Sequence, residues 1–380
     1  MLEIGLRIEG VPGTDWFRTD RLSHPVRCHR PSSDVTANAL DMVRSMIVVL
    51  TGCAGPLGAR VTRALREHAP DARVVVADTP EDQASIVERC DVVVDLGSSD
   101  YDRRAARRES VTGVAASTLF TADRLRASQV VFVSSALVYG ALANNPVPLT
   151  EEAVLRPDVE FVFARQLASA EELVEQWRQS RSGRVTCVLR PVVALAAGRN
   201  SRLSAALVSG LGRRFAEDDP PSQFLHLDDL AVAIALAVEQ RLDGVYNVAP
   251  DGWVAGERVR ALSGERPRIP IPERLTEVVG GLRWRFQRGP IPPGLRSYTR
   301  EPWVVSNGRL RATGWRATVT NEQTYVESTE APWWTMVSPK RRQELALGAG
   351  VAAVVVAALV GVLIGRRRIN RRRAEQAARG

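Results

Sequence analysis

The sequence predicts an α/β protein built on a doubly wound parallel sheet, and three observations lead to this class. Short apolar runs alternate with amphipathic helical segments between Met46 and Pro191. Each run is continuously apolar, which is typical of parallel strands that are covered on both faces. A glycine-rich stretch, TGCAGPLG, joins the first run to the first helix at residues 51–58. A hydrophobic content of 45% over 380 residues is also ample for a core.

The expected elements follow one another regularly. The predicted strands are MIVVL, ARVVVAD, DVVVDLG, QVVFVSS and VTCVLRP, at residues 46–50, 72–78, 91–97, 129–135 and 185–191. The predicted helices cover residues 59–69, 80–90, 110–128 and 163–180. Strands that alternate with helices imply βαβ units and hence a parallel sheet.

Beyond Pro191 the pattern loosens, and a smaller C-terminal lobe is expected there. FLHLDDLAVAIALAVE, residues 224–239, predicts the end of a strand that leads into a helix, with Asp228 or Asp229 as the N-cap. GVYNVAP, residues 244–250, predicts a further short strand. Arginines then crowd the chain at positions 266, 268, 274, 283, 285, 288, 296 and 300.

Charge and hydropathy at the C-terminal end predict a membrane anchor. Residues 345–365, LALGAGVAAVVVAALVGVLIG, hold no charged residue, and 21 helical residues span roughly 31 Å, about one bilayer core. From Met336 onward the chain has ten basic and two acidic residues. The net charge of this segment is therefore +8, the same as that of the whole chain. A basic tail on a neutral body favours a membrane surface over nucleic acid.

The orientation of this anchor follows from two opposing signals. The arginines after the span favour a cytoplasmic C-terminal end. The opening residues MLEIGLRIEG contain no apolar segment of a signal peptide that would export the body. Because nothing in these residues marks the body for export, we expect a C-terminal single-pass anchor in the cell membrane with the body in the cytoplasm.

Metal and disulfide chemistry are not expected. The four cysteines, Cys28, Cys53, Cys90 and Cys187, form no C-x-x-C pair, and the four histidines do not cluster. This pattern argues against a zinc site or a disulfide framework and fits a reducing compartment.

The stretch TGCAGPLG predicts a nucleotide-binding loop. Gly52 permits a tight turn, Gly55 lets backbone N–H groups approach a pyrophosphate, and Gly58 lets the helix pack closely on the strand. The N-terminus of the helix adds partial positive charge for the phosphates. The cofactor-binding set therefore comprises Thr51, Gly52, Gly55, Pro56, Leu57 and Gly58, together with Asp78 and Pro191 from later strand ends.

Asp78 is expected to bear on the choice of cofactor. It ends the second predicted strand, where a carboxylate accepts hydrogen bonds from a ribose 2′-OH and repels a 2′-phosphate. This favours NAD over NADP. An N-cap ahead of the helix that starts at Pro80 explains the same residue almost as well.

Several of these stretches together resemble a known family. TGCAGPLG, VVFVSSALVYG, LRP, FLHLDDLAVAIALA, GVYNVAP and GW followed by TVTNEQ occur in the order seen in extended short-chain dehydrogenase/reductases. These form the NAD-dependent epimerase/dehydratase family, which includes the UDP-glucose 4-epimerases. The similarity covers about residues 46–328, and the glycine motif and SSALVYG are its specific parts.

The resemblance implies a catalytic set that this chain lacks in part. In the family a tyrosine acts as general acid/base, a lysine four residues later lowers its pKa and holds the nicotinamide ribose, and a serine polarises the substrate oxygen. The serine matches Ser135. In FARQLASAE the tyrosine and lysine positions fall on Phe163 and Leu167, while Glu171 matches the family's glutamate. A phenylalanine has no proton to transfer, so the usual mechanism is not expected.

The resemblance also divides the chain. Residues 42–192 are expected to form a Rossmann-like NAD(P)-binding core, and residues 193–330 the remainder of the sheet with a substrate-type lobe. A linker at 331–344, the transmembrane helix at 345–365 and a basic tail at 366–380 follow. Residues 1–41 are either a disordered arm or precede the true start, since Met42 and Met46 lie directly before the first strand.

Three functional hypotheses remain open. The first is a membrane-anchored NAD(P)-binding sensor, scaffold or partner subunit with a degenerate catalytic site, working alone, as a homo-oligomer or with a membrane protein. The second is an active oxidoreductase or epimerase on a sugar nucleotide or lipid-linked substrate that uses other acid/base groups. The third is a structural protein without a nucleotide, since only about a dozen residues separate Asp78 from the next strand, too few for the family's further strand at the adenine side.

Overall fold

The computed structural model describes residues 45–77, 87–198, 200–211, 219–262 and 293–329. Its main sheet contains β1 (Ile47–Thr51), β2 (Arg73–Val76), β3 (Val92–Asp95), β4 (Gln129–Val133), β5 (Val185–Pro191) and β8 (Gly244–Val248). All neighbours are parallel, in the order β2-β1-β3-β4-β5-β8. This confirms the predicted α/β fold with a parallel, Rossmann-like sheet.

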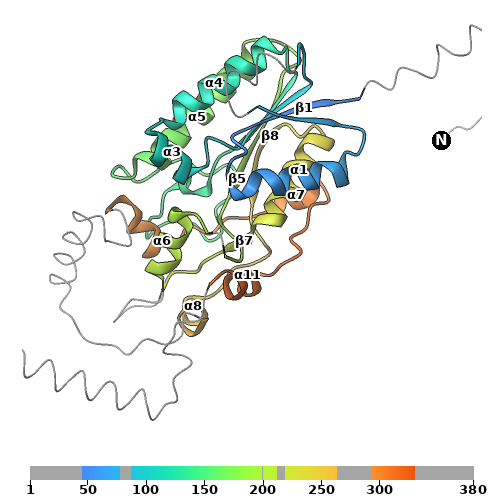
Figure 1. Cartoon of the computed structure of the whole chain (residues 1–380). Coiled ribbons are helices and arrows are strands. Elements are labelled where there is room, and N and C mark those ends of the chain that lie inside the picture. The colour runs from blue at the N-terminus through green and yellow to red at the C-terminus, as the bar shows by residue number, and fades with distance from the viewer. Residues whose placement is uncertain (1–44, 78–86, 199, 212–218, 263–292, 330–380) are drawn as a thin grey trace, which may run out of the picture. The chain divides into compact units, whose positions relative to one another are not determined.

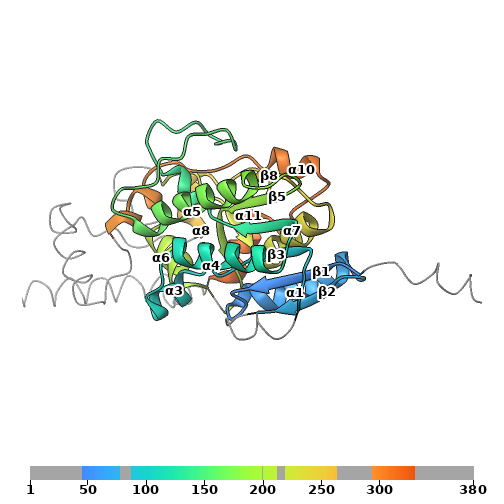
Figure 2. The same cartoon turned by 90° about the horizontal axis from the view of Figure 1, so that it is seen from above.

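Helices cover both faces of the sheet (Figure 1). The helices are α1 (Pro56–His68), α3 (Tyr101–Arg107), α4 (Val111–Arg124), α5 (Val162–Gln179), α6 (Arg202–Gly210), α7 (Leu227–Glu239), α8 (Gly256–Leu262), α10 (Gly308–Ala312) and α11 (Asn321–Ser328). Helices α4 and α5 pack together on one face, and α1 and α7 on the other, as Figures 1 and 2 both show. The sheet is thus wound on both sides, as its continuously apolar strands predict.

The strands place alternate side chains in two cores. Val48 and Leu50 of β1 lie in the core beneath α1 and α7, whereas Val49 lies in the core beneath α4 and α5. All three are at most 1% exposed. Because successive side chains of a strand point to opposite faces, a strand buried on both sides must be apolar throughout.

A smaller group of elements lies beyond the carboxyl end of β5. β6 (Val193–Leu195) pairs in parallel with β7 (Phe224–His226), α6 and α11 pack against this pair, and α8 packs against α11. The 3₁₀ turns Ala136–Tyr139, Pro293–Leu295 and Ser297–Thr299 complete the described elements. The arginine-crowded segment largely lies outside the described residues.

The structure corrects two details of the sequence prediction. The helix expected at 80–90 lies mostly outside the described residues, but residues 87–90 are not helical. The N-cap of α7 is His226, not Asp228 or Asp229: its Nδ1 accepts a hydrogen bond from the Asp228 backbone N–H at 3.3 Å. Both aspartates lie in the first turn, where their charge favours the helix N-terminus, and the Asp229 carboxylate also accepts bonds from Thr318 and Val319.

The terminal segments of the chain stay predictions. The arm at 1–41, the linker at 331–344, the span at 345–365 and the tail at 366–380 all lie outside the described residues. Within the described ranges, no helix is both long and apolar enough to span a bilayer.

Candidate functional site: the glycine loop and the strand ends around it

The glycine loop connects β1 to α1 at the carboxyl end of the sheet. Gly52 has a φ of +76°, and a Cβ there would lie 2.2 Å from the backbone nitrogen of Gly97. A Cβ on Gly58 would lie 2.2 Å from the carbonyl oxygen of Cys53. Thus Gly52 allows the glycine loop to contact the loop after β3, and Gly58 allows α1 to start close against the backbone of Cys53 in the glycine loop.

Other residues of the motif shape the start of α1. Gly55 is the N-cap and Pro56 follows at the first helical position, where its missing N–H costs no hydrogen bond. No side chain caps this end, and the first turn holds no acidic residue. Thr51 ends β1, and its hydroxyl donates to the Val94 carbonyl at 3.3 Å. The N-terminal end of α1 therefore has the partial positive charge that a phosphate group requires.

Replacing Gly52 by alanine is expected to lower the free energy of unfolding by about 2–3 kcal/mol, because strain at positive φ adds to a backbone clash. We also expect nucleotide affinity to fall more than tenfold, measured by calorimetric titration alongside urea unfolding. Gly252→Ala is the matched control, since Gly252 has a φ of +67° and a Cβ added there would meet nothing within 4 Å. Equal effects of the two changes would contradict a packing role for Gly52.

A second loop, after β3, braces the glycine loop and was not predicted. Asp95 is fully buried and accepts hydrogen bonds from the Gly97 N–H at 2.9 Å and from the Ser98 N–H at 3.0 Å. The Ser98 hydroxyl donates to the same carboxylate at 2.6 Å. Burial raises the pKa of Asp95, and these hydrogen bonds oppose the rise. In the sequence, the only local sign of this buried carboxylate is its place directly after three valines in DVVVDLGSS.

Asp78, the residue expected to bear on cofactor choice, lies outside the described residues, so the preference for NAD stays a prediction. In the part of the chain that the structure describes, β2 is the edge strand of the sheet on this side. The connection that follows β2, residues 78–86, lies outside the described residues, so the shortened adenine side also stays a prediction.

Ser135 and Pro191 come together at the ends of β4 and β5. The Ser135 hydroxyl lies 3.5 Å from the Pro191 carbonyl oxygen and accepts a hydrogen bond from the Leu137 N–H at 3.3 Å. Ser135 is partly exposed. Its hydroxyl is therefore at the strand ends, where ligands bind in sheets of this topology, and two residues predicted from separate motifs are neighbours.

Phe163 and Leu167 lie in the core of the protein on α5. Phe163 is 5% exposed and Leu167 is fully buried. The Phe163 ring packs edge-on against Tyr101 at 5.3 Å between centroids, and the Arg104 guanidinium lies 4.8 Å from the ring centre. Neither side chain carries a titratable group, and both are held by apolar and aromatic contacts.

A buried polar cluster is built around Glu171, and the sequence does not indicate which side chains meet in it. Glu171 forms an ion pair with Arg190 at 2.6 Å and accepts a hydrogen bond from Ser134 at 2.5 Å. Arg190 donates to the Tyr139 hydroxyl at 2.8 Å, and that hydroxyl donates to Asn247 at 2.8 Å. The cluster thus ties α5 to β4, β5 and β8.

Four tyrosines of the described chain have raised pKa values, the opposite of what a general base needs. Burial is the main cause of the rise at Tyr101, Tyr139, Tyr246 and Tyr298. Arg190 opposes the rise in the pKa of Tyr139 without reversing it. The Tyr298 hydroxyl donates a hydrogen bond to the Leu137 carbonyl at 2.7 Å. Burial thus favours the protonated form of these four hydroxyls.

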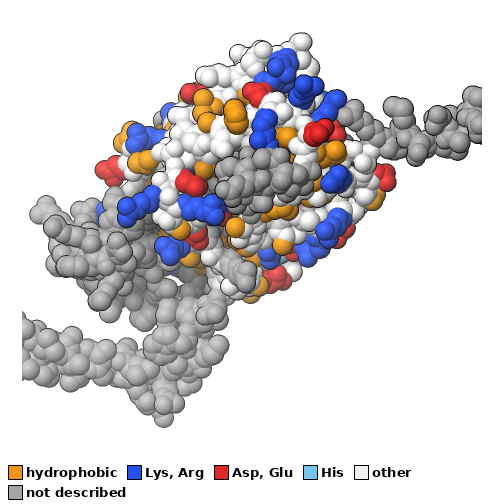
Figure 3. All heavy atoms as spheres, turned by 45° about the horizontal axis from the view of Figure 1, so that its top comes forward, with side chains coloured by type: hydrophobic (Ala, Val, Ile, Leu, Met, Phe, Trp, Pro, Cys, Tyr) orange, Lys and Arg blue, Asp and Glu red, His pale blue; other side chains and the backbone are white. Residues whose placement is uncertain are grey.

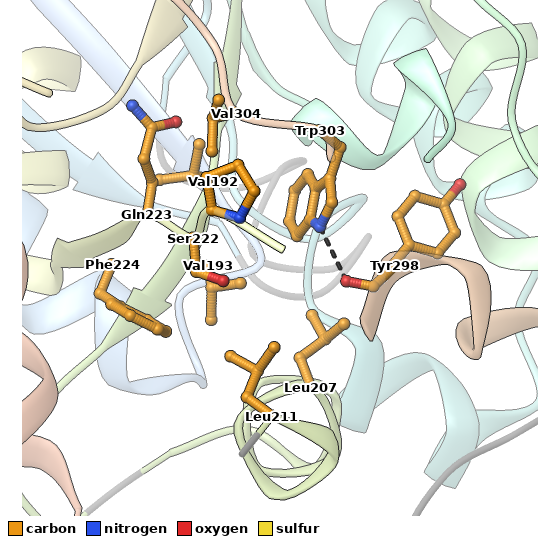
Figure 4. Close-up of a pocket in the computed structure, with 11 residues that line it drawn as sticks. Val192, Val193, Leu207, Leu211, Ser222, Gln223, Phe224, Tyr298, Trp303 and Val304 are labelled. Carbon is orange, nitrogen blue, oxygen red and sulfur yellow. Dashed lines mark hydrogen bonds between the residues drawn. The ribbon is translucent and has the colours of Figure 1, made fainter. Parts of the chain in front are cut away.

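The pocket beyond the end of β5 is small and mostly apolar (Figure 4). Val192 and Val193 line it from the strand, Leu207 and Leu211 from α6 and the residue that follows it, and Trp303 from the C-terminal segment. Its volume is about 20 Å³, which is room for about one water molecule. A shallow groove of about 450 Å³ runs past Phe163 on another side, and its lining includes two arginines and two glutamates.

The surface carries no extended field of one sign in the view of Figure 3, where basic side chains stand among acidic ones. This agrees with the sequence, in which the net positive charge lies in the C-terminal tail.

Residues 48–249 match the model of the NAD dependent epimerase/dehydratase family. The chain belongs to this family. The matched segment begins at β1 and ends just after β8, so it contains the glycine loop, Ser135, Phe163 and Leu167. A search of curated proteins found no match to the chain.

Solved structures of epimerase/dehydratase family members share the fold. UDP-glucose 4-epimerase of Thermus thermophilus, in complex with NAD, has a TM-score of 0.52 and 19% identity over 74% of this chain and 97% of that one. The Thermotoga maritima enzyme with UDP-glucose has a TM-score of 0.51 and 18% identity over 77% of this chain and all of that one. A human epimerase family protein with NADPH has a TM-score of 0.53 and 19% identity over 74% and 98%. At such identities the likeness establishes the fold.

Proposed function

We propose that the chain is a membrane-anchored NAD(P)-binding protein that acts as a sensor, scaffold or partner subunit with little or no redox turnover. The observation that carries this proposal is the glycine loop, with its sterically required glycines, in the same fold as a buried Phe163 and Leu167 at the positions of the family's acid/base pair. Nucleotide binding needs the glycine loop. Turnover by the family's mechanism needs a tyrosine and a lysine, which Phe163 and Leu167 replace.

The residues present fit a dinucleotide. Gly52 and Gly58 let neighbouring backbone segments pack closely and so shape the glycine loop, and the first turn of α1 contains no acidic residue. Gly55 and this helix end would hold the pyrophosphate, and Asp78 would accept bonds from the adenosine ribose. When bound, a nicotinamide cofactor supplies hydride chemistry, for which this chain offers only Ser135 of the family's three polar groups.

Location forms part of the proposal. The apolar segment 345–365 would anchor the chain in the cell membrane, and the body would lie on the cytoplasmic side, where nucleotides are plentiful. Flotation of membranes with the full chain, followed by protease accessibility of the body in intact cells and in permeabilised ones, tests both statements. Recovery of the chain in the soluble fraction would overturn the anchor.

A calorimetric titration of the full chain in detergent with NAD⁺, NADH, NADP⁺ and NADPH tests the binding step. We expect micromolar binding of at least one form, with NAD favoured over NADP. The titrated protein then shows no hydride transfer above background, and Ser135→Ala leaves the affinity within about twofold of the parent, because the serine serves the substrate rather than the phosphates. Absence of binding by a folded chain would favour the structural hypothesis instead.

A second candidate function rests on Ser135. Its partly exposed hydroxyl lies beside Pro191 at the strand ends, where a serine that polarises a substrate oxygen belongs. The solved structure of the Thermotoga maritima enzyme contains UDP-glucose. Turnover of a sugar nucleotide or lipid-linked sugar that is lost in Ser135→Ala would favour this oxidoreductase or epimerase activity over the first proposal.

A further inference from the structure

Asp100 places a carboxylate against the glycine loop. It follows β3 in the second loop and caps α3, where its Oδ1 accepts the Arg103 backbone N–H at 2.9 Å. The other oxygen, Oδ2, is turned to the glycine loop: a Cβ built on Gly55 would lie 2.9 Å from it. The open side of Gly55 therefore faces a negatively charged oxygen.

A pyrophosphate bound by the glycine motif would approach the backbone on that side of Gly55. A glycine is useful there because the absence of a Cβ lets phosphate oxygens approach the backbone N–H groups at the start of α1. Gly55 is the N-cap of α1 and no side chain caps that helix. A carboxylate in this position interacts with the same partial positive charge as a phosphate would and repels the phosphate itself.

Arg60 and Arg104 each have other partners. Arg60, in the first turns of α1, donates to the Pro56 carbonyl at 2.7 Å, and its guanidinium pairs with Asp228 of α7 at 2.9 Å. Arg104 of α3 interacts electrostatically with Asp100, but its guanidinium donates hydrogen bonds to Gln166 at 3.0 Å and to the Glu109 carbonyl at 3.4 Å.

We propose that Asp100 competes with the phosphates of a dinucleotide for the N-terminal end of α1 and so lowers the affinity of the site. This rests on the proposed function, since it concerns the same nucleotide site. The consequence is a site that is filled only at high nucleotide concentration, which suits a sensor better than an enzyme with a permanently held cofactor.

Asp100→Asn separates this role from capping. Asparagine caps a helix as well as aspartate does, so the change keeps α3 and removes only the charge. Asp102→Asn is the matched control: it removes the same charge two residues later, where the carboxylate accepts the Arg202 backbone N–H at the start of α6.

The test is titration of the full chain with NAD⁺ at low and high salt. We expect Asp100→Asn to bind at least about fivefold more tightly than the parent, Asp102→Asn to bind as the parent does, and the gain to shrink as salt screens the repulsion. Unchanged melting temperatures of both variants show that the fold is retained.

The failures of the two proposals are distinguishable. If the parent and Asp100→Asn bind NAD⁺ equally, or Asp102→Asn gains as much, the role of Asp100 is overturned and the nucleotide site stands. If no variant binds NAD⁺, including Asp100→Asn, both the role of Asp100 and the proposed function are overturned.

Discussion

Leu167→Lys is expected to lower the free energy of unfolding by roughly 3–5 kcal/mol near neutral pH, the cost of an uncompensated charge in the core. Leu167 is fully buried on α5, in the core beneath α4 and α5. Desolvation would hold the pKa of the introduced amine below its unfolded value. The folded state then binds fewer protons than the unfolded state, so the destabilisation shrinks as pH rises from that lowered pKa toward about 10.4.

Urea unfolding at several pH values measures this loss, and Leu167→Met is the volume-matched control, expected to cost less than about 1.5 kcal/mol. The combined change Phe163→Tyr with Leu167→Lys is expected to give no redox turnover, because the lysine weakens the helix that would present both groups. A stable double variant with turnover would contradict the interpretation of these positions as core.

Arg190→Met is expected to cost roughly 3–5 kcal/mol, because it leaves the Glu171 carboxylate buried without its cation. Both side chains of the pair are 6–7% exposed, and burial alone would lower the pKa of Arg190, whereas Glu171 and Tyr139 raise it on balance. The double change Arg190→Met with Glu171→Leu is expected to recover much of the loss, since apolar replacement of a whole buried pair is often nearly neutral.

A double-mutant cycle by urea unfolding measures this coupling. The exposed pair of Arg178 and Glu175 on the outside of α5 provides the control, and Arg178→Met there is expected to cost at most about 1 kcal/mol. Strict additivity of the Arg190 and Glu171 changes would show that the buried pair does not act as a unit.

The sheet and its covering helices were predictable because their signals are local. A continuous run such as VVFV predicts a strand covered on both faces, and the spacing of Val61 and Leu65 predicts α1. The short helix α3 was missed because YDRRAAR is too polar and too short to show a period, and only the cap at Asp100 marks its start. The N-cap of α7 was misassigned because His226 caps less often than aspartate.

Site residues were predictable only where they belong to one continuous sequence motif. The glycine loop is such a motif, and Ser135 and Pro191 were each found from the stretches that flank them. The partner of Glu171 was not found, because Arg190 lies 19 residues away on another strand and nothing local links the two. Asp100 was missed for the same reason: its importance comes from Gly55, in a loop much earlier in the chain, which packing brings to it.

The pairing of β5 with β8 has a consequence for the order in which the chain is made. Between Pro191 and Gly244 the growing chain must lay down α6, β7 and α7 before the strand that completes the sheet exists. Until Asn247 arrives, β5 has an open edge and the Tyr139 hydroxyl lacks its acceptor. A chain truncated near residue 192 therefore exposes an apolar sheet edge that can associate with other chains. We expect such a fragment to aggregate more readily than the full chain.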